Sequence, residues 1–215
     1  MDTKSVITGD IVASTTIKAE WRDSLLATLR EIANEMKGFS SLEMEFFRGD
    51  SFQMVIDKPE LALKIAILLR AGLKASTPPS TDSLWDARMA IGVGTISYRS
   101  EKIVVSDGEA FRLSGRGLDE MDKERLSVRT CWDDVNEEMA VSTAFADDII
   151  SSWSVAQAQV VYATLSRDIA QKDLAVEIGK SAQSVSKLLG VAKENLIRLY
   201  LGRYFKLVTT HIAAL

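Results

Sequence analysis

The segment from Gln171 to Gly190, QKDLAVEIGKSAQSVSKLLG, constrains the fold of this chain more than any other part of it. Its spacing of apolar residues predicts two short helices that pack on each other through Leu174, Ile178, Val185 and Leu188. Gly179 follows the first helix, where a left-handed residue ends a helix and sets the turn. Ala175 is small enough for a close helix crossing, and Ser181 suits the N-cap of a helix that begins near Ala182. This pattern is typical of a helix-turn-helix.

The second helix of this pair predicts a DNA-binding surface. Its polar residues, with the N-cap residue before them, are Ser181, Gln183, Ser184, Ser186 and Lys187. Side chains of these types reach base edges and phosphates when a helix enters the major groove. A plain helical hairpin that packs only against its own protein is the alternative, and the sequence leaves it open.

The distribution of charge favours a polyanionic partner for the tail. Residues 166–215 hold eight Lys and Arg and four Asp and Glu, a net charge of +4, whereas residues 1–165 hold 18 and 26, a net charge of −8. An acidic body with a basic end is the asymmetry expected of a chain that meets nucleic acid. Because the excess is modest, one copy would bind DNA weakly and a dimer would bind it more tightly.

Composition limits the remaining classes of protein. With 215 residues, 47% hydrophobic and 26% charged, the chain is predicted to be globular, with one large or two small domains. The single cysteine, Cys131, excludes an intrachain disulfide framework and favours a cytoplasmic location. We expect no membrane association, because the start does not resemble a signal peptide and the longest apolar stretch, Leu61–Leu69, is interrupted by Lys64. A zinc site of the common kinds is not expected with one histidine and one cysteine.

Hydrophobic periodicity predicts an α+β domain over residues 1–131. The expected elements are a strand at 5–8, a helix at 17–36, a hairpin of strands 42–47 and 51–56, a helix at 59–74, a strand from 87, a second hairpin arm at 102–105, a helix at 108–121 and a strand at 126–130. We expect a largely antiparallel sheet with helices packed over it.

The rest of the chain is predicted to be helical. Residues 132–153 are acidic and uneven, which indicates a helical connector, and residues 154–215 form the expected all-α helix-turn-helix domain. The helix from Pro59 to Lys74 is apolar on nearly all sides, so it is either deeply buried or part of an interface. We expect a homodimer on this ground.

Two Gly-Asp pairs predict a metal site in the front domain. Asp10 ends the first strand and Asp50 lies at the tip of the first hairpin, so the two carboxylates can lie side by side on adjacent strands. Such a pair suits Mg²⁺, which prefers oxygen ligands and brings phosphates with it. After Asp10 the chain runs through Ile11, Val12, Ala13 and Ser14 into a helix start, where free backbone N–H groups suit a phosphate. The alternative is that Gly-Asp is an ordinary turn dipeptide here.

Four segments carry a resemblance to a known family: VITGDIVAST, EFFRGDSFQM, ARMAIGVGTIS and GEAFRLSGRGL, in this order. Over roughly residues 4–131 they resemble the catalytic domain of class III nucleotidyl cyclases, and more closely the bacterial SatD family, whose members also fit the helix-turn-helix tail. The resemblance implies a ferredoxin-like or cyclase-like antiparallel sheet, with Asp10 and Asp50 as metal ligands and Arg116 as the arginine that supports the transition state. It also implies an altered site, because Arg112 replaces an asparagine and Phe46 replaces a base-selecting lysine.

Three arginines predict an anion clamp. Arg112 and Arg116 are four residues apart on one helix face, and Arg48 lies beside Asp50 in the sequence. Together they would surround the phosphates of a nucleotide. Pairing of these arginines with local acids such as Glu109 or Glu120 is the alternative.

These observations favour a DNA-binding transcription-type regulator. Its cyclase-like domain would sense a nucleotide or a phosphorylated metabolite, with Mg²⁺ as a possible cofactor. The altered base-selecting positions favour this hypothesis. The retained carboxylate pair favours a second one, a Mg²⁺-dependent nucleotide-processing enzyme in which Arg116 is catalytic and the tail serves assembly. A third hypothesis is an interaction protein with neither activity.

Overall fold

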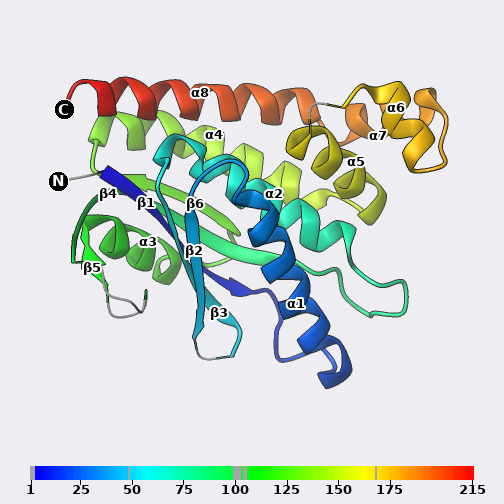
Figure 1. The fold of residues 1–215 in the computed structure, drawn as a ribbon, viewed down its shortest axis with the longest axis horizontal. Helices are drawn as coiled ribbons and strands as arrows, with labels where there is room; N and C mark the ends of the chain where they lie inside the picture. The colour runs from blue at the N-terminus through cyan, green and yellow to red at the C-terminus, as the bar shows by residue number, and fades with distance from the viewer. Residues whose placement is uncertain (1–2, 48, 99–102, 104–105, 168) are drawn as a thin grey trace.

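The computed structural model of the protein describes residues 3–47, 49–98, 103, 106–167 and 169–215 (Figure 1). It is a mixed α+β structure, in which an open six-stranded sheet is packed among helices. Beyond β6 the regular elements of the described chain are all helices (Figure 1). None of the helices in the described part of the chain is both long and apolar enough to cross a membrane.

The sheet is built around β1 (Thr3–Ile11), which lies between β3 and β4 and is antiparallel to both. The other strands are β2 (Leu42–Phe47), β3 (Ser51–Ile56), β4 (Ala87–Tyr98), β5 (Asp107–Gly108) and β6 (Leu126–Thr130). Their order is β2-β3-β1-β4-β5, and β6 pairs with β4 in parallel, so the sheet is mixed. The predicted hairpin of β2 and β3 is confirmed, and most pairs are antiparallel as expected.

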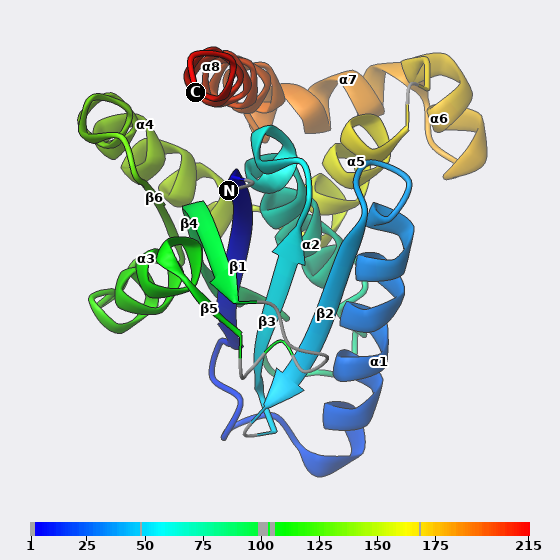
Figure 2. The ribbon, with the colours of Figure 1, turned by 60° about the vertical axis from the view of Figure 1, so that its left-hand side comes forward.

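Alternating residues of the sheet face two different layers of helices. Ile7 of β1 packs with α1 (Ala19–Met36) and α2 (Ala62–Ala75), whereas Val6 packs on the other face with Phe111 of α3 (Glu109–Asp119). Figure 2 shows α3 on the opposite side of the sheet from α1 and α2. The glycine at position 92 allows α3 to lie this close, because a Cβ there would be 2.2 Å from the carbonyl oxygen of Ala110.

The all-apolar helix predicted at Pro59–Lys74 is buried within its own chain. It consists of a short 3₁₀ turn, η1 (Pro59–Leu61), followed by α2, and every residue from Ala62 to Lys74 except Lys64 is buried. Its cover comes from α1, the sheet and the helical tail: α4 (Asp133–Ser152), α5 (Val155–Ser166) and α8 (Glu194–Ala213). The argument that this helix requires a second copy is therefore wrong, because the same chain covers it.

The apolar core runs without interruption from the sheet through α2 into the tail. A hydrogen bond crosses the same boundary, from the Tyr204 hydroxyl to the carbonyl of Pro59 at 2.8 Å. Within the tail, Trp153 Nε1 donates to the carbonyl of Ala192 at 2.8 Å. The tail is completed by α6 (Gln171–Glu177) and α7 (Ala182–Val191), which lie at the end farthest from the C-terminus (Figure 1).

Four elements meet at a buried ionic cluster. Arg70 of α2 and Asp86, just before β4, both have fully buried side chains and share two hydrogen bonds, of 2.9 and 3.0 Å. Arg70 also reaches Asp147 of α4, and Asp86 is further paired with Lys74 and Arg125. Buried charges are tolerated only when they are paired in this way, so the cluster fixes α2, α4 and the sheet in one arrangement.

Some expected boundaries differ from the structure. The helix expected from residue 17 begins at Ala19, and a turn occupies residues 12–16. The expected strand arm at 102–105 lies outside the described residues except for Ile103, and β5 pairs with the far end of β4. The acidic segment expected as a connector forms one helix of 20 residues, α4, because Val135, Met139 and Ile150 give it a buried face.

Candidate functional site

The pair α6–α7 has the local geometry that its sequence predicts. Gly179 has φ +64°, in the left-handed region, and ends the turn after α6. Ser181 caps α7, because its hydroxyl accepts the backbone N–H of Ser184 at 3.1 Å. Leu174 and Val185 are fully buried between the helices, so the predicted apolar contact is confirmed for them. Ile178 and Leu188 are only partly buried.

The outer face of α7 is polar and open. Gln183, Ser184, Ser186 and Lys187 are all exposed, as is the cap residue Ser181. Within the described part of the chain, neither Gln183 nor Lys187 forms a hydrogen bond or an ion pair. A side chain in this state can bind a partner without first breaking a contact inside its own protein.

A hollow of about 630 Å³ lies beside the start of α7. Lys180 and Lys187 line it together with Gln157 of α5. Lys180, which directly precedes the cap residue, was not among the predicted site residues. A lysine near the positive N-terminal end of a helix is electrostatically unfavourable by itself, and this would have indicated an anion-binding role. Two lysines beside this helix start suit a phosphate group.

The front candidate site lies where β1, β3 and β4 meet. Asp10 is paired with Ser51 across β3, so Asp50 is one residue beyond it, and the backbone N–H of Ile11 donates to the carbonyl of Asp50 at 3.2 Å. The two carboxylate residues are thus on neighbouring strand ends, as their positions in the sequence predict.

The Asp10 carboxylate is already occupied by Arg88. Nε and Nη2 of Arg88 donate to its two oxygens, at 3.0 and 2.7 Å, and the pair is only partly exposed. Asp50 accepts a hydrogen bond of 2.5 Å from the Ser14 hydroxyl. Sequence analysis missed Arg88, although the strand register places it directly opposite Asp10. A cation that binds Asp10 therefore has to displace Arg88 from both oxygens.

The expected row of free amides is wrong in part. The N–H of Ile11 bonds to Asp50 and that of Val12 donates to the carbonyl of Asp86 at 3.0 Å, so neither is available to a phosphate. Ala13 and Ser14 follow in a turn, where Ala13 has φ +54°, and not in the first turn of a helix. The physical reason is that the chain reverses direction here before α1. The two backbone hydrogen bonds, to Asp50 and Asp86, hold this reversal at the ends of the strands.

The arginine clamp does not form among the described residues. Arg112 pairs with Asp107 at 2.9 Å, which is the local pairing left open by the sequence. Arg116 is exposed, and Arg48 lies outside the described residues. Among the residues described, no three His, Cys, Asp or Glu side chains gather in a way that would hold a metal ion.

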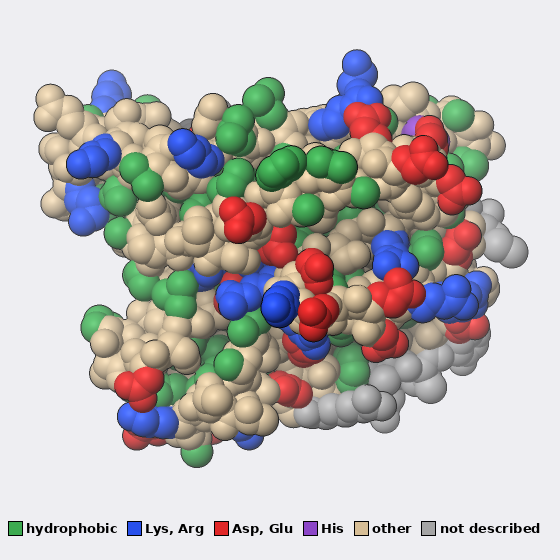
Figure 3. All heavy atoms as spheres, turned by 180° about the vertical axis from the view of Figure 1, so that it is seen from behind, with side chains coloured by type: hydrophobic (Ala, Val, Ile, Leu, Met, Phe, Trp, Pro, Cys, Tyr) green, Lys and Arg blue, Asp and Glu red, His purple; other side chains and the backbone are tan. Residues whose placement is uncertain are grey.

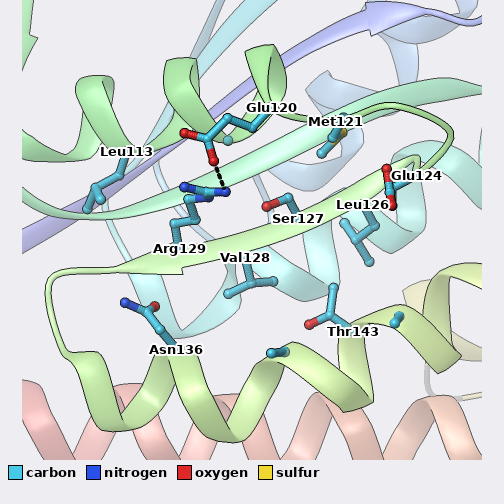
Figure 4. A pocket seen from close by; sticks show the side chains of 13 residues that line it. Leu113, Glu120, Met121, Glu124, Leu126, Ser127, Val128, Arg129, Asn136 and Thr143 are labelled. Carbon is cyan, nitrogen blue, oxygen red and sulfur yellow. Dashed lines mark hydrogen bonds and ion pairs between the residues drawn. The ribbon is translucent and has the colours of Figure 1, made fainter.

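A further hollow, of about 470 Å³, lies between α3, β6 and α4 (Figure 4). Arg129 projects into it from β6 and pairs at 2.6 Å with Glu120, the residue that directly follows α3. Ser127, Asn136 and Thr143 supply further polar atoms around it (Figure 4). This groove could not be predicted from the sequence, because its walls come from three separate segments.

No protein-family model matches the sequence, and comparison with curated proteins finds no match.

Proposed function

We propose that the protein is a DNA-binding regulator whose front domain senses a nucleotide or a phosphorylated metabolite. The observation that carries the proposal is the exposed polar face of α7, presented after a left-handed glycine and a serine cap. On this face Gln183 and Lys187 have no hydrogen bond or ion pair among the described residues. In a helix-turn-helix the second helix presents such a face to the major groove. The net charge of +4 on residues 166–215 supports a polyanionic partner.

The strand order supports the family resemblance of the front domain. The chain order β1-α1-β2-β3-α2-β4 and the spatial order β2-β3-β1-β4 agree with the ferredoxin-like, cyclase-like sheet that the resemblance implies. We propose on this basis a SatD-like, cyclase-like domain. A cytoplasmic location follows from a DNA-binding role.

The surroundings of Phe46 favour sensing over base-selective catalysis. Phe46 lies 6.1 Å from Phe52, measured between ring centroids, and the Arg30 guanidinium lies 4.4 Å above its ring. A phenylalanine side chain has no hydrogen-bond donor or acceptor, so Phe46 cannot select a base as a lysine would. These contacts also hold its ring in place. The ligand would instead be held through its phosphates by Arg88, with Ser14 and Asp50 beside it.

The second candidate function is a Mg²⁺-dependent nucleotide-processing enzyme. The observation that favours it is the placement of Asp10 and Asp50 on neighbouring strand ends. Mg²⁺ held there would neutralise a polyphosphate, and Arg116 would stabilise the charge of the transition state. Under this function Arg88 would have to leave Asp10 whenever the metal binds.

Selection of bound sequences from a random DNA pool tests the first function. We expect an enriched, roughly palindromic site, because a dimer places two such helices on half-sites about one helical turn apart. Lys187→Ala should weaken binding about equally on all sequences and flatten the salt dependence by roughly one unit. Gln183→Ala should relax the preference at one base position, by about 1–3 kcal/mol.

Lys123→Ala is the matched control, because it removes one exposed lysine from the sheet half of the molecule. It should leave both affinity and salt dependence unchanged. Absence of any enriched sequence, or equal effects of Lys187→Ala and Lys123→Ala, would overturn the DNA-binding function.

A further inference from the structure

The sheet has an open edge at β6, because β4 is its only partner among the described strands. The backbone N–H of Met89 donates to the carbonyl of Arg125 at 3.0 Å. The N–H of Cys131 donates to the carbonyl of Val93 at 2.9 Å. The odd-numbered residues of β6 therefore direct their backbone groups toward β4, and the even-numbered residues direct theirs away from the sheet.

The chain itself shows which chemical group fits this edge. At Thr130 the side-chain amide of Asn136 pairs with both outward backbone groups: its Oδ1 accepts the Thr130 N–H at 2.7 Å, and its Nδ2 donates to the Thr130 carbonyl at 2.8 Å. A planar group with a donor beside an acceptor thus takes the place of a neighbouring strand. Two residues earlier, the outward N–H and carbonyl of Val128 have no such partner in the part of the chain that the structure describes.

Val128 lines the groove of about 470 Å³ between α3, β6 and α4 (Figure 4). Leu113 and Met121 form an apolar wall on the side of α3, and Ala140 and Ala144 form the wall on the side of α4. A concave site of this size, with apolar walls and a few polar groups, is typical of small-molecule binding. The open backbone pair of Val128 is therefore placed where a ligand can reach it.

The open part of the edge is too short for an added peptide strand. It runs from Leu126 to Val128, about 7 Å at the ordinary rise of a strand. A strand in a sheet usually has about five or six residues, and the Asn136 amide blocks its path at Thr130. A compact ring needs only the donor and acceptor of one residue, so it fits this edge better than a peptide does.

Charge limits the ligand further. The groove is lined by two carboxylates, Glu120 and Glu124, and by the guanidinium of Arg129, which is already paired with Glu120. No second cation is found among the described residues of the lining, so a phosphate group would meet an excess of negative charge. A ligand without a phosphate is favoured.

We infer that this groove binds a planar group that carries a hydrogen-bond donor beside an acceptor and has no phosphate. The pairing edge of a nucleobase and the carboxamide of nicotinamide both have this chemistry. The ligand donates to the Val128 carbonyl and accepts the Val128 N–H, and its ring lies between the walls of α3 and α4. This site is separate from Asp10 and Arg88, and it does not rest on the function proposed above.

Titration of the full chain, isotope-labelled at valine, with uridine, adenosine and nicotinamide tests the site by NMR. We expect at least one of these probes to shift the Val128 amide resonance, which is assigned by its loss in Val128→Ile. A shift with nicotinamide alone would identify a carboxamide as the source of the chemistry, and a shift with a nucleoside would identify a base. The nucleoside methylated at its donor nitrogen should bind about five- to tenfold more weakly, because the Val128 carbonyl then has no partner.

Two substitutions locate the ligand in the groove. Ala144→Trp fills the groove and should abolish binding, and because Ala144 is exposed the variant should keep its circular dichroism and melting temperature. Ala27→Trp, at an exposed position of α1 outside the groove, is the matched control and should bind as the wild type does. Glu120→Gln removes one of the two carboxylates, so a nucleoside monophosphate should bind it more tightly than it binds the wild type.

Three results would overturn the site. They are a Val128 resonance that none of the three probes shifts, equal binding of the nucleoside and its methylated form, and equal binding by Ala144→Trp and Ala27→Trp. Tighter binding of the monophosphate than of the nucleoside to the wild-type groove would overturn the exclusion of phosphate. None of these results bears on DNA selection or on ligand binding at Asp10, so the two proposals fail separately.

Discussion

Asp86 and Asp10 each receive two hydrogen bonds from an arginine, yet they lie in opposite environments. The side chains of Asp86 and Arg70 are completely buried, whereas those of Asp10 and Arg88 keep 21% and 33% of their exposure. Asp86 and Arg88 are only two residues apart in the sequence. The Asp86–Arg70 pair, together with Asp147, joins the sheet to α2 and α4, and the Asp10–Arg88 pair lies at the ends of β1 and β4.

The comparison shows that the same aspartate–arginine pairing has different consequences when it is buried and when it is partly exposed. A buried charge without its partner is strongly destabilising, so the Asp86 cluster must remain formed while the protein is folded. A partly exposed pair contributes little to stability and can be broken by a competing ion. The Asp10–Arg88 pair is therefore suited to exchange, and the Asp86 cluster is not.

The largest expected effect follows from removing Asp86. Asp86→Ala leaves Arg70 and Lys74 buried beside each other without their shared carboxylate, and we expect the free energy of unfolding to fall by about 3–5 kcal/mol. Asp10→Ala at the exposed edge should lower it by only about 0–1 kcal/mol. Urea unfolding of both variants measures the difference. Equal losses would show that burial does not distinguish the two pairs.

Much of the fold could be predicted from the sequence because it depends on local periodicity. Alternation in residues 42–56 predicts the β2–β3 hairpin, and helical spacing predicts α1, α2 and α5. The cover of α2 could not be predicted, since an all-apolar helix looks alike whether its own chain or a second copy surrounds it. Nor could the sequence predict that α4 is a single continuous helix, because the residues of its buried face are interspersed with acidic ones.

The candidate sites likewise combine local features, which the sequence predicts, with long-range contacts, which it does not. The cap at Ser181 and the turn at Gly179 are local features, so the sequence predicts them. The partner of Asp10 is not local: Arg88 is identified only by the register between β1 and β4. The same holds for the amides of Ile11 and Val12, whose acceptors lie just before β3 and β4.

The pH dependence of stability should come from the buried cluster. Burial alone would raise the pKa of Asp86, but Arg70, Lys74 and Arg125 outweigh this and hold the pKa below its ordinary value of 3.8. A lowered pKa contributes stability that is present above about pH 4 and is lost as the pH falls through the folded-state value. We therefore expect the difference in unfolding free energy between wild type and Asp86→Asn to be constant near neutrality and to shrink in acid. A difference that grows in acid would contradict this sign.

Within the cluster, Lys74 should matter less than Asp86. Burial lowers the pKa of Lys74 in spite of the nearby Asp86, which indicates that its charge is held at some cost. Lys74→Met removes that charge, keeps most of the volume and leaves Asp86 paired with Arg70 and Arg125. We expect the free energy of unfolding to change by less than about 1.5 kcal/mol. A loss as large as that of Asp86→Ala would show that the ammonium, and not the carboxylate, is the centre of the cluster.

The smallest expected effect concerns the exposed pair and separates the two candidate functions. Arg88→Ala frees both oxygens of Asp10, so a cation no longer has to displace the guanidinium. Since an exposed pair contributes about 0.2–1 kcal/mol, Mg²⁺-dependent binding of a nucleoside triphosphate should tighten by about 1.4- to fivefold if Asp10 is a metal ligand. If Arg88 instead holds the phosphates of a sensed ligand, the same variant should weaken binding, with or without Mg²⁺.

Calorimetry with a nucleoside triphosphate, in Mg²⁺ and in chelator, distinguishes these outcomes. Arg112→Ala serves as the control, because it breaks the exposed pair with Asp107 and leaves Asp10 unchanged. Tighter binding in Mg²⁺ alone would favour the enzyme, since only a metal gains from an unoccupied Asp10. Weaker binding under both conditions would favour the sensor, because the arginine would then be the ligand-binding cation. If Arg88→Ala and Arg112→Ala had the same effect on binding, neither candidate function would be located at Asp10 and Arg88. The Asp86 cluster would then be a structural ion pair, and the Asp10–Arg88 pair would be a surface ion pair without a role in ligand binding.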